Sequence, residues 1–182
     1  MKGKLAVVAL FTTMGIASSV MAQDGTVNFT GKIIEAGCQV DSNVTNPQSV
    51  QLGEVAKTAF VAAGDTAATT KFSLVLTGCP ADLLGKPVSV KYDGTPDAVN
   101  NDYLQLTNAG TAGIAEGVAI QLLNADSSAL PLGVESKEVE IKGSAAAPES
   151  TKLDFYARYI ATKAGVVGGD ANGSVNFTLT YN

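Results

Sequence analysis

The chain has 182 residues, of which 16% are charged and 6% aromatic, and it contains neither histidine nor tryptophan. Its 12 Lys and Arg residues against 17 Asp and Glu residues give a net charge of −5, and Arg158 is the only arginine. This balance is unsuited to binding nucleic acid or an anionic membrane surface. Because the sequence contains no histidine, it excludes the common zinc sites with histidine ligands and the Ser–His catalytic arrangements.

The first 22 residues are predicted to be a secretory signal peptide. Lys2 and Lys4 form a basic start, residues 5–20 are mostly apolar, and a small-residue cleavage site ends at Ala22. The apolar run is short for a membrane anchor. The exported mature chain therefore begins at Gln23, with 10 basic residues against 17 acidic residues, a charge of −7. Its 160 residues suit one domain.

Near the mature N-terminus, residues 26–34 alternate between apolar and polar positions, which predicts an extended strand. One face of that strand would carry Val27, Phe29, Gly31 and Ile33. Glycine inside a strand marks either a bulge or a place where another backbone comes close. Two interpretations follow: an ordinary internal first strand, or a free strand that pairs with the sheet edge of another molecule.

Two cysteines, Cys38 and Cys79, are present. In an exported protein, an even number of cysteines predicts a disulfide, here a single bond between the ends of two strands. The loop that it closes, of about 40 residues, corresponds to about 4 kcal/mol of stabilisation in the chain-entropy description.

The remainder of the chain is predicted to form short strands separated by turns. These strands are expected at residues 49–55, 71–77, 87–92, 103–106, 118–123, 139–141, 152–162 and 173–181, with room for one helical turn within residues 54–63. Many short strands at close spacing predict an all-β sandwich or barrel. No nucleophile elbow, phosphate loop or dinucleotide fingerprint is present, so we expect neither an enzyme nor a metal or cofactor site.

The last strand has the same strict alternation as the first. Val175, Phe177, Leu179 and Tyr181 would share one face, and the pattern runs to the penultimate residue. No later strand follows in the sequence to supply a second neighbour. In an immunoglobulin-like sandwich the missing neighbour would be the last strand, and its absence would expose core and backbone.

Taken together, these features resemble the subunits of chaperone–usher fimbriae, closest to the major subunits of type 1 and P fimbriae. The matching features are the signal peptide, the alternating N-terminal extension and several short motifs. The motifs are Gly37-Cys38, Val50-Gln51-Leu52-Gly53, the stretch from Phe72 to Cys79, Phe155-Tyr156-Ala157-Arg158-Tyr159, Gly169 and the penultimate Tyr181.

The resemblance implies an incomplete immunoglobulin-like β-sandwich over residues 36–182 that lacks its last strand. Residues 23–35 would donate a strand, through Val27, Phe29, Gly31 and Ile33, to the next subunit of a surface fimbria. Val175, Phe177, Leu179, Tyr181 and Asn182 would form the acceptor groove and the contact with a periplasmic chaperone, whose strand an outer-membrane usher then exchanges for the N-terminal extension of the next subunit. The alternatives are a minor pilus adaptor and a soluble secreted β-sandwich that binds a ligand.

Overall fold

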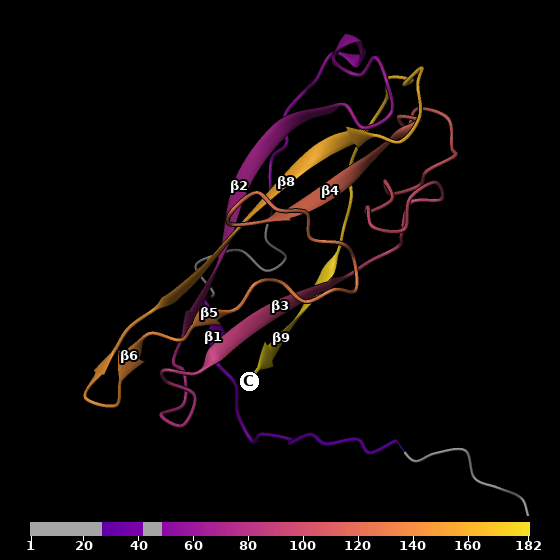
Figure 1. Cartoon of the computed structure of the whole chain (residues 1–182). Coiled ribbons are helices and arrows are strands. Elements are labelled where there is room, and N and C mark those ends of the chain that lie inside the picture. The colour runs from indigo at the N-terminus through magenta and orange to yellow at the C-terminus, as the bar shows by residue number, and fades with distance from the viewer. Residues whose placement is uncertain (1–26, 42–48) are drawn as a thin grey trace, which may run out of the picture. The chain divides into compact units, whose positions relative to one another are not determined.

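The computed structural model describes residues 27–41 and 49–182, which fall into two compact units, one ending at Ile33 and one running from Ile34 to Asn182 (Figure 1). Residues 27–33, the described part of the first unit, form no helix or strand. The predicted signal peptide (1–22) and the start of the predicted extension lie outside the described residues. Strands and turns make up the second unit.

One sheet of the second unit contains the two longest strands of the domain. Its order is β1 (Gln39–Val40), β2 (Thr66–Thr77), β8 (Thr151–Ala161) and β4 (Val118–Asn124), and each neighbouring pair is antiparallel. Figure 1 shows β2, β8 and β4 side by side. Phe72 lies opposite Phe155 in this sheet, so aromatic side chains from both long strands point into the same layer.

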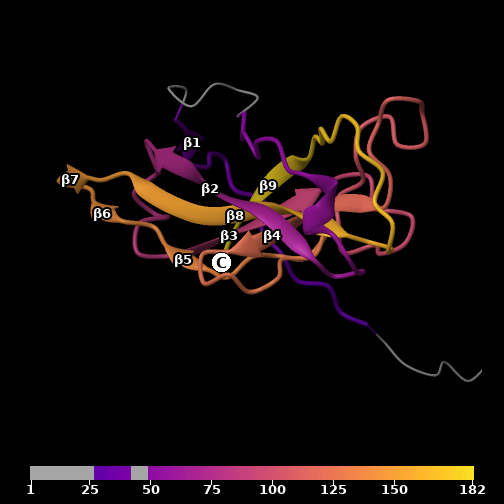
Figure 2. The same cartoon turned by 90° about the horizontal axis from the view of Figure 1, so that it is seen from above.

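The second sheet is smaller, and it ends in the last strand of the chain. Its order is β5 (Val139–Glu140), β3 (Pro87–Asp93) and β9 (Asn176–Tyr181), again antiparallel. A small hairpin of β6 (Gly143–Ser144) and β7 (Ala147–Pro148) projects at one end of the domain (Figure 2). The 3₁₀ turn η1 covers Lys57–Ala59, within the stretch where the sequence leaves room for a helical turn.

The core lies between the two sheets and is built from alternate residues of their strands. Leu74, Leu153 and Phe155 of the first sheet and Val88 and Val90 of the second are almost fully buried. Period-two alternation places such residues on the inner face of each strand, where burial of apolar surface stabilises the sandwich. The prediction of an all-β sandwich is confirmed.

Two predicted strands are absent, and others have different bounds. Residues 49–55 and 103–106 form no strand. The described part of residues 26–34 forms no strand within this chain, so the interpretation as an internal first strand is wrong, whereas pairing with another molecule stays a prediction. Leu104 and Leu106 are buried and Leu104 makes isolated bridges to Pro96 and Ile120, so their apolar pattern reflects core packing in an irregular segment. The strand expected at 71–77 begins earlier, at Thr66, and passes a bulge where Ala68 has a φ of +58°. The strand expected at 173–181 begins only at Asn176.

In the part of the chain that the structure describes, no helix is long and apolar enough to cross a bilayer.

Candidate functional site

Strand β9 lies at the edge of its sheet. It pairs with β3 along its length, with Tyr92 opposite Phe177 and Val88 opposite Tyr181. Among the described residues, no strand pairs with its other edge. A strand edge presents a row of backbone donors and acceptors that another strand can use. The strand that the sequence singled out for lacking a neighbour is therefore an open edge of the sandwich.

A groove of about 270 Å³ runs beside the first part of this strand. Its floor includes Leu74 of β2 and Ile120 of β4. One side is formed by Val50 and Leu52, and the other by the segment from Gly173 to Phe177. An apolar floor between two open segments is a site that an apolar strand could fill.

A second hollow, of about 280 Å³, follows the first along the same two segments of the chain. Phe60 is among the residues beneath it, and Val55 and Val166 belong to its two sides. Exposed charged residues, Lys57 and Asp170, also line it. The groove therefore continues past β9, and its far end combines apolar contacts with charge.

At Gly173, which lines the first hollow, the backbone lies close to side chains of the groove. A Cβ atom placed on Gly173 would lie 2.7 Å from Cδ1 of Ile120 and 3.2 Å from Cδ2 of Leu104. A side chain at position 173 would therefore have to displace the ends of these two side chains. Leu104, Ile120 and Gly173 all line the first hollow, so the backbone at Gly173 packs directly against the side chains of the groove.

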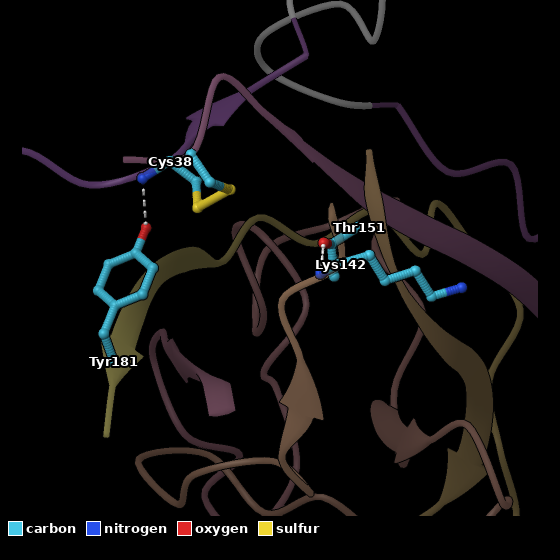
Figure 3. The surroundings of a disulfide bond; sticks show 5 residues. Cys38, Lys142, Thr151 and Tyr181 are labelled. Carbon is cyan, nitrogen blue, oxygen red and sulfur yellow. Dashed lines mark hydrogen bonds between the residues drawn. A yellow bond between two sulfur atoms is a disulfide. The ribbon is translucent and has the colours of Figure 1, made fainter. Parts of the chain in front are cut away.

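The opposite end of β9 is tied to the start of the domain. The backbone N–H of Cys38 donates to Oη of Tyr181 at 2.9 Å, and a Cβ on Gly37 would lie 2.9 Å from the same oxygen (Figure 3). The disulfide expected between Cys38 and Cys79 is formed, with Cα atoms 4.1 Å apart. Residues 37–38 therefore pack against the side chain of Tyr181 at this end of β9.

The outer face of β9 is polar and is joined to its sheet through Glu135. The hydroxyl of Ser89 donates to Oε2 of Glu135 at 2.7 Å. This bond, with a second from the Thr180 side chain, holds the pKa of Glu135 below its ordinary value. The carboxylate links strands β3 and β9 on the side away from the groove, so β9 is held on one face while its edge stays open.

The predicted groove residues lie in three places: in the first hollow, against the core, and at the exposed chain end. Val175 and Phe177 line the first hollow, and the Phe177 side chain is 38% exposed. Leu179 and Tyr181 are half-buried against the core and do not line either hollow. Asn182 is exposed, and its Nδ2 donates to Oε1 of Glu138 at 2.7 Å.

The apolar residues of the predicted donor segment are open to solvent. The exposed fractions are 75% for Val27, 92% for Phe29 and 96% for Ile33. No atom lies within 4 Å of the position that a Cβ on Gly31 would occupy. Three large apolar side chains exposed in one short segment have an unfavourable hydration free energy that burial in a partner would relieve.

Sequence reasoning missed two parts of this site. Val50 and Leu52 form one side of the groove, although their alternation predicted an ordinary strand. Tyr92 also lines the groove; it is 2% exposed and its hydroxyl has no hydrogen-bond partner among the described residues. Burial raises the pKa of Tyr92 above its ordinary value of 10.0. The alternation of Val88, Val90 and Tyr92 was the available signal that this ring points inward.

This fold and groove define an immunoglobulin-like β-sandwich in which the place of one edge strand is open. The chain belongs to the fimbrial protein family: a family model described as "Fimbrial protein" matches residues 27–182. Members of this family are structural subunits of chaperone–usher pili on the cell surface, where they assemble with other pilus subunits, and they are not enzymes.

Known relatives match over nearly the whole chain. The probable major fimbrial subunit LpfA of Escherichia coli O157:H7 is 33% identical over 97% of this chain and 94% of its own length. A Burkholderia pseudomallei antigen and type I fimbria protein of known structure is 37% identical, with a TM-score of 0.58 over 86% of this chain and 97% of its own. The P pilus rod subunit PapA, at 21% identity and a TM-score of 0.63 over 81% of this chain and 100% of its own, has a similar fold.

Proposed function

We propose that this chain is a fimbrial rod subunit that polymerises by donor-strand exchange, in which residues 27–33 of one copy fill the groove beside β9 of the next. The observation that carries this proposal is an open groove and an exposed apolar segment in the same chain. Strand addition to a sheet edge uses backbone hydrogen bonds for affinity and alternate side chains for specificity. The contact is head-to-tail and does not close on itself, so repetition gives a filament.

The energetics of such a joint are large for a non-covalent contact. Burying Val27, Phe29 and Ile33 contributes about 1.5–3 kcal/mol for each side chain. Each backbone hydrogen bond to the open edge of β9 adds about 1 kcal/mol. Completion of the acceptor's core adds more, so a joint made in this way opens slowly without any covalent bond.

Gly31 has a specific place in this proposal. It is the one position on the apolar face of the donor segment without a side chain. Leu104 and Ile120 of the groove lie close to the backbone at Gly173. We expect the donor residue that faces these two side chains to have the least room, which favours placing Gly31 there.

A rod subunit is a better description than a minor adaptor. LpfA, which is 33% identical, is named as a probable major fimbrial subunit. The exposed donor segment also suits a subunit that continues the filament.

Deletion of residues 24–33 tests the exchange step. We expect the shortened subunit to form no filaments, because it can accept a strand but cannot donate one. A synthetic peptide of residues 24–35 should bind it with a stoichiometry of one, measured by a native-gel shift. Filaments formed by the shortened subunit, seen by electron microscopy of sheared cell-surface material, would contradict the proposal.

Before polymerisation, we infer that a periplasmic chaperone occupies the same groove and that an outer-membrane usher exchanges it for the next subunit. Val175 and Phe177 in the groove and the exposed Asn182 at the chain end support this route. Removing Tyr181 and Asn182 should abolish co-purification with the chaperone, and the subunit should be degraded in the periplasm. Recovery of the truncated chain in a stoichiometric chaperone complex would count against this contact.

A further inference from the structure

We propose that Asn172, in the wall of the empty groove, is a site of deamidation, and that a strand filling the groove protects it. Asn172 is exposed and is among the residues that line the second hollow. It is the only asparagine of the chain that is followed by glycine. The reaction itself does not depend on the proposed function, whereas the protection and its effect on strand uptake rest on that function.

Deamidation of asparagine starts at the backbone nitrogen of the residue that follows. Hydroxide from water removes the N–H proton of Gly173, and the nitrogen then attacks Cγ of Asn172 to close a succinimide ring. The bond from Cγ to Nδ2 breaks, and Nδ2 leaves as ammonia after it takes a proton from water. A second water molecule opens the ring to give aspartate or isoaspartate. Glycine favours ring closure because it has no side chain in the way.

The backbone around Asn172 leaves the reacting groups free. Gly173 precedes β9, which begins at Asn176, and its N–H donates no hydrogen bond to another described residue. The amide side chain of Asn172 likewise has no hydrogen-bond partner among the described residues. The N–H of Thr107 donates to the carbonyl oxygen of Asn172 at 2.8 Å. That bond draws electron density from the peptide group, so the N–H proton of Gly173 is easier to remove.

Either product alters the groove at a point where its backbone packs closely. A Cβ on Gly173 would lie 2.7 Å from Cδ1 of Ile120, so the backbone has little room to shift toward the floor. Isoaspartate carries the main chain through its side-chain methylene group and lengthens the backbone beside this contact. Both products also add a carboxylate to the hollow that Glu54 and Asp170 line, where like charges repel. We therefore expect a deamidated groove to take up a strand poorly.

A filled groove should slow the reaction, because ring closure requires the backbone and side chain to rotate. In the proposed joint, the inserted strand covers the hollow that Asn172 lines and holds the wall in place. Backbone within a paired strand is freed only by local opening. Asn176 provides an internal comparison, since it is exposed but lies in β9 opposite Asp93 and is followed by the bulky Phe177. Asn176 should therefore keep its amide where Asn172 loses it.

The test compares the purified mature subunit with sheared filaments of the same chain, both aged in neutral buffer. After denaturation, trypsin cleavage at Lys163 releases residues 164–182, a fragment that contains both Asn172 and Asn176. Mass spectrometry of this fragment before and after ageing locates any amide that has become an acid. We expect conversion of Asn172 in the free subunit, mostly to isoaspartate, and retention of its amide in filaments. Retention in the aged free subunit, or equal conversion in filaments, would overturn the proposal.

Uptake of a peptide of residues 24–35 by the aged free subunit tests the effect on the groove. We expect the wild-type subunit to lose its initial uptake in proportion to the fraction converted. Asn172→Gln, whose longer side chain closes the corresponding ring far more slowly, should keep its own initial uptake. The matched control Asn176→Gln should lose uptake at the wild-type rate. Undiminished uptake after conversion would overturn the effect on the groove, whereas no uptake by fresh wild-type subunit would overturn the proposed function.

Discussion

The hydroxyl groups of Tyr92 and Tyr159, two tyrosines that line the groove, have different surroundings. The hydroxyl of Tyr159 donates to the carbonyl oxygen of Ala171 at 3.0 Å, whereas that of Tyr92 is buried without a partner among the described residues. Both rings line the groove, Tyr92 in the first hollow and Tyr159 in the second. A buried polar group without a partner retains a desolvation cost that no interaction offsets.

We therefore expect opposite effects from the same substitution at these two residues. Tyr92→Phe should raise the free energy of unfolding by up to about 1 kcal/mol, because it removes an unpaired buried hydroxyl. Tyr159→Phe, the matched control, should lower it by about 0.5–1.5 kcal/mol, because it removes a formed hydrogen bond. Urea unfolding of the purified mature subunit measures both changes. A loss of stability in Tyr92→Phe as large as that in Tyr159→Phe would show that the Tyr92 hydroxyl has a partner in solution.

Among the elements, β1 is the shortest strand of its sheet and depends on a covalent tie. It has two residues, Gln39 and Val40, paired with Thr77 and Leu76 at the end of β2. The disulfide from Cys38 to Cys79 joins the same two elements, and the Cys38 N–H reaches Tyr181 at the end of β9. One short segment thus fastens both sheets of the domain at this end.

Replacing both cysteines, Cys38→Ser with Cys79→Ser, should reduce the stability of the subunit by about 4 kcal/mol, since the closed loop of about 40 residues is released. A domain with an open groove is only marginally stable until a partner strand completes it. We therefore expect the variant to be degraded before assembly. Immunoblots of the periplasm and of sheared surface material measure its level. Normal amounts of subunit and normal filaments would contradict this expectation.

At the scale of the whole molecule, apolar patterning in the sequence predicted the strands that pair within the domain. Apolar residues recur at every second position in β3, β8 and β9 and from Phe72 to Leu76 in β2, whereas β4 is apolar almost throughout and fully buried. The segments around Leu52 and Leu104 have a similar pattern, but their backbones are irregular, because these side chains complete the core or the groove wall without a ladder partner. The apolar pattern of a segment indicates which of its side chains are buried. Whether the segment forms a strand depends on whether it pairs with another strand in the fold.

At the N-terminal segment, the backbone in the structure differs from the strand that the sequence pattern predicts. Its alternation is as regular as that of β9, yet residues 27–33 form no strand and expose Val27, Phe29 and Ile33. A strand requires a neighbour, and this segment finds none within its own domain. The sequence could predict the amphipathic strand and the missing neighbour of β9. It could not reveal the opposite wall of the groove at Val50, or the charged far end at Lys57, because these depend on how distant segments meet.

The measurement that tests the central claim most directly is uptake of two peptides by one acceptor. The acceptor is the subunit lacking residues 24–33, and the peptides cover residues 24–35 with the native sequence or with Gly31→Leu. We expect the native peptide to bind, and the leucine peptide to bind poorly, because overpacking the groove beside Leu104 and Ile120 costs about 1–3 kcal/mol. A full-length Gly31→Leu subunit should still accept the native peptide at the wild-type rate. Equal uptake of the two peptides, or no uptake of either, would contradict the assignment of residues 27–33 as the strand that fills the groove.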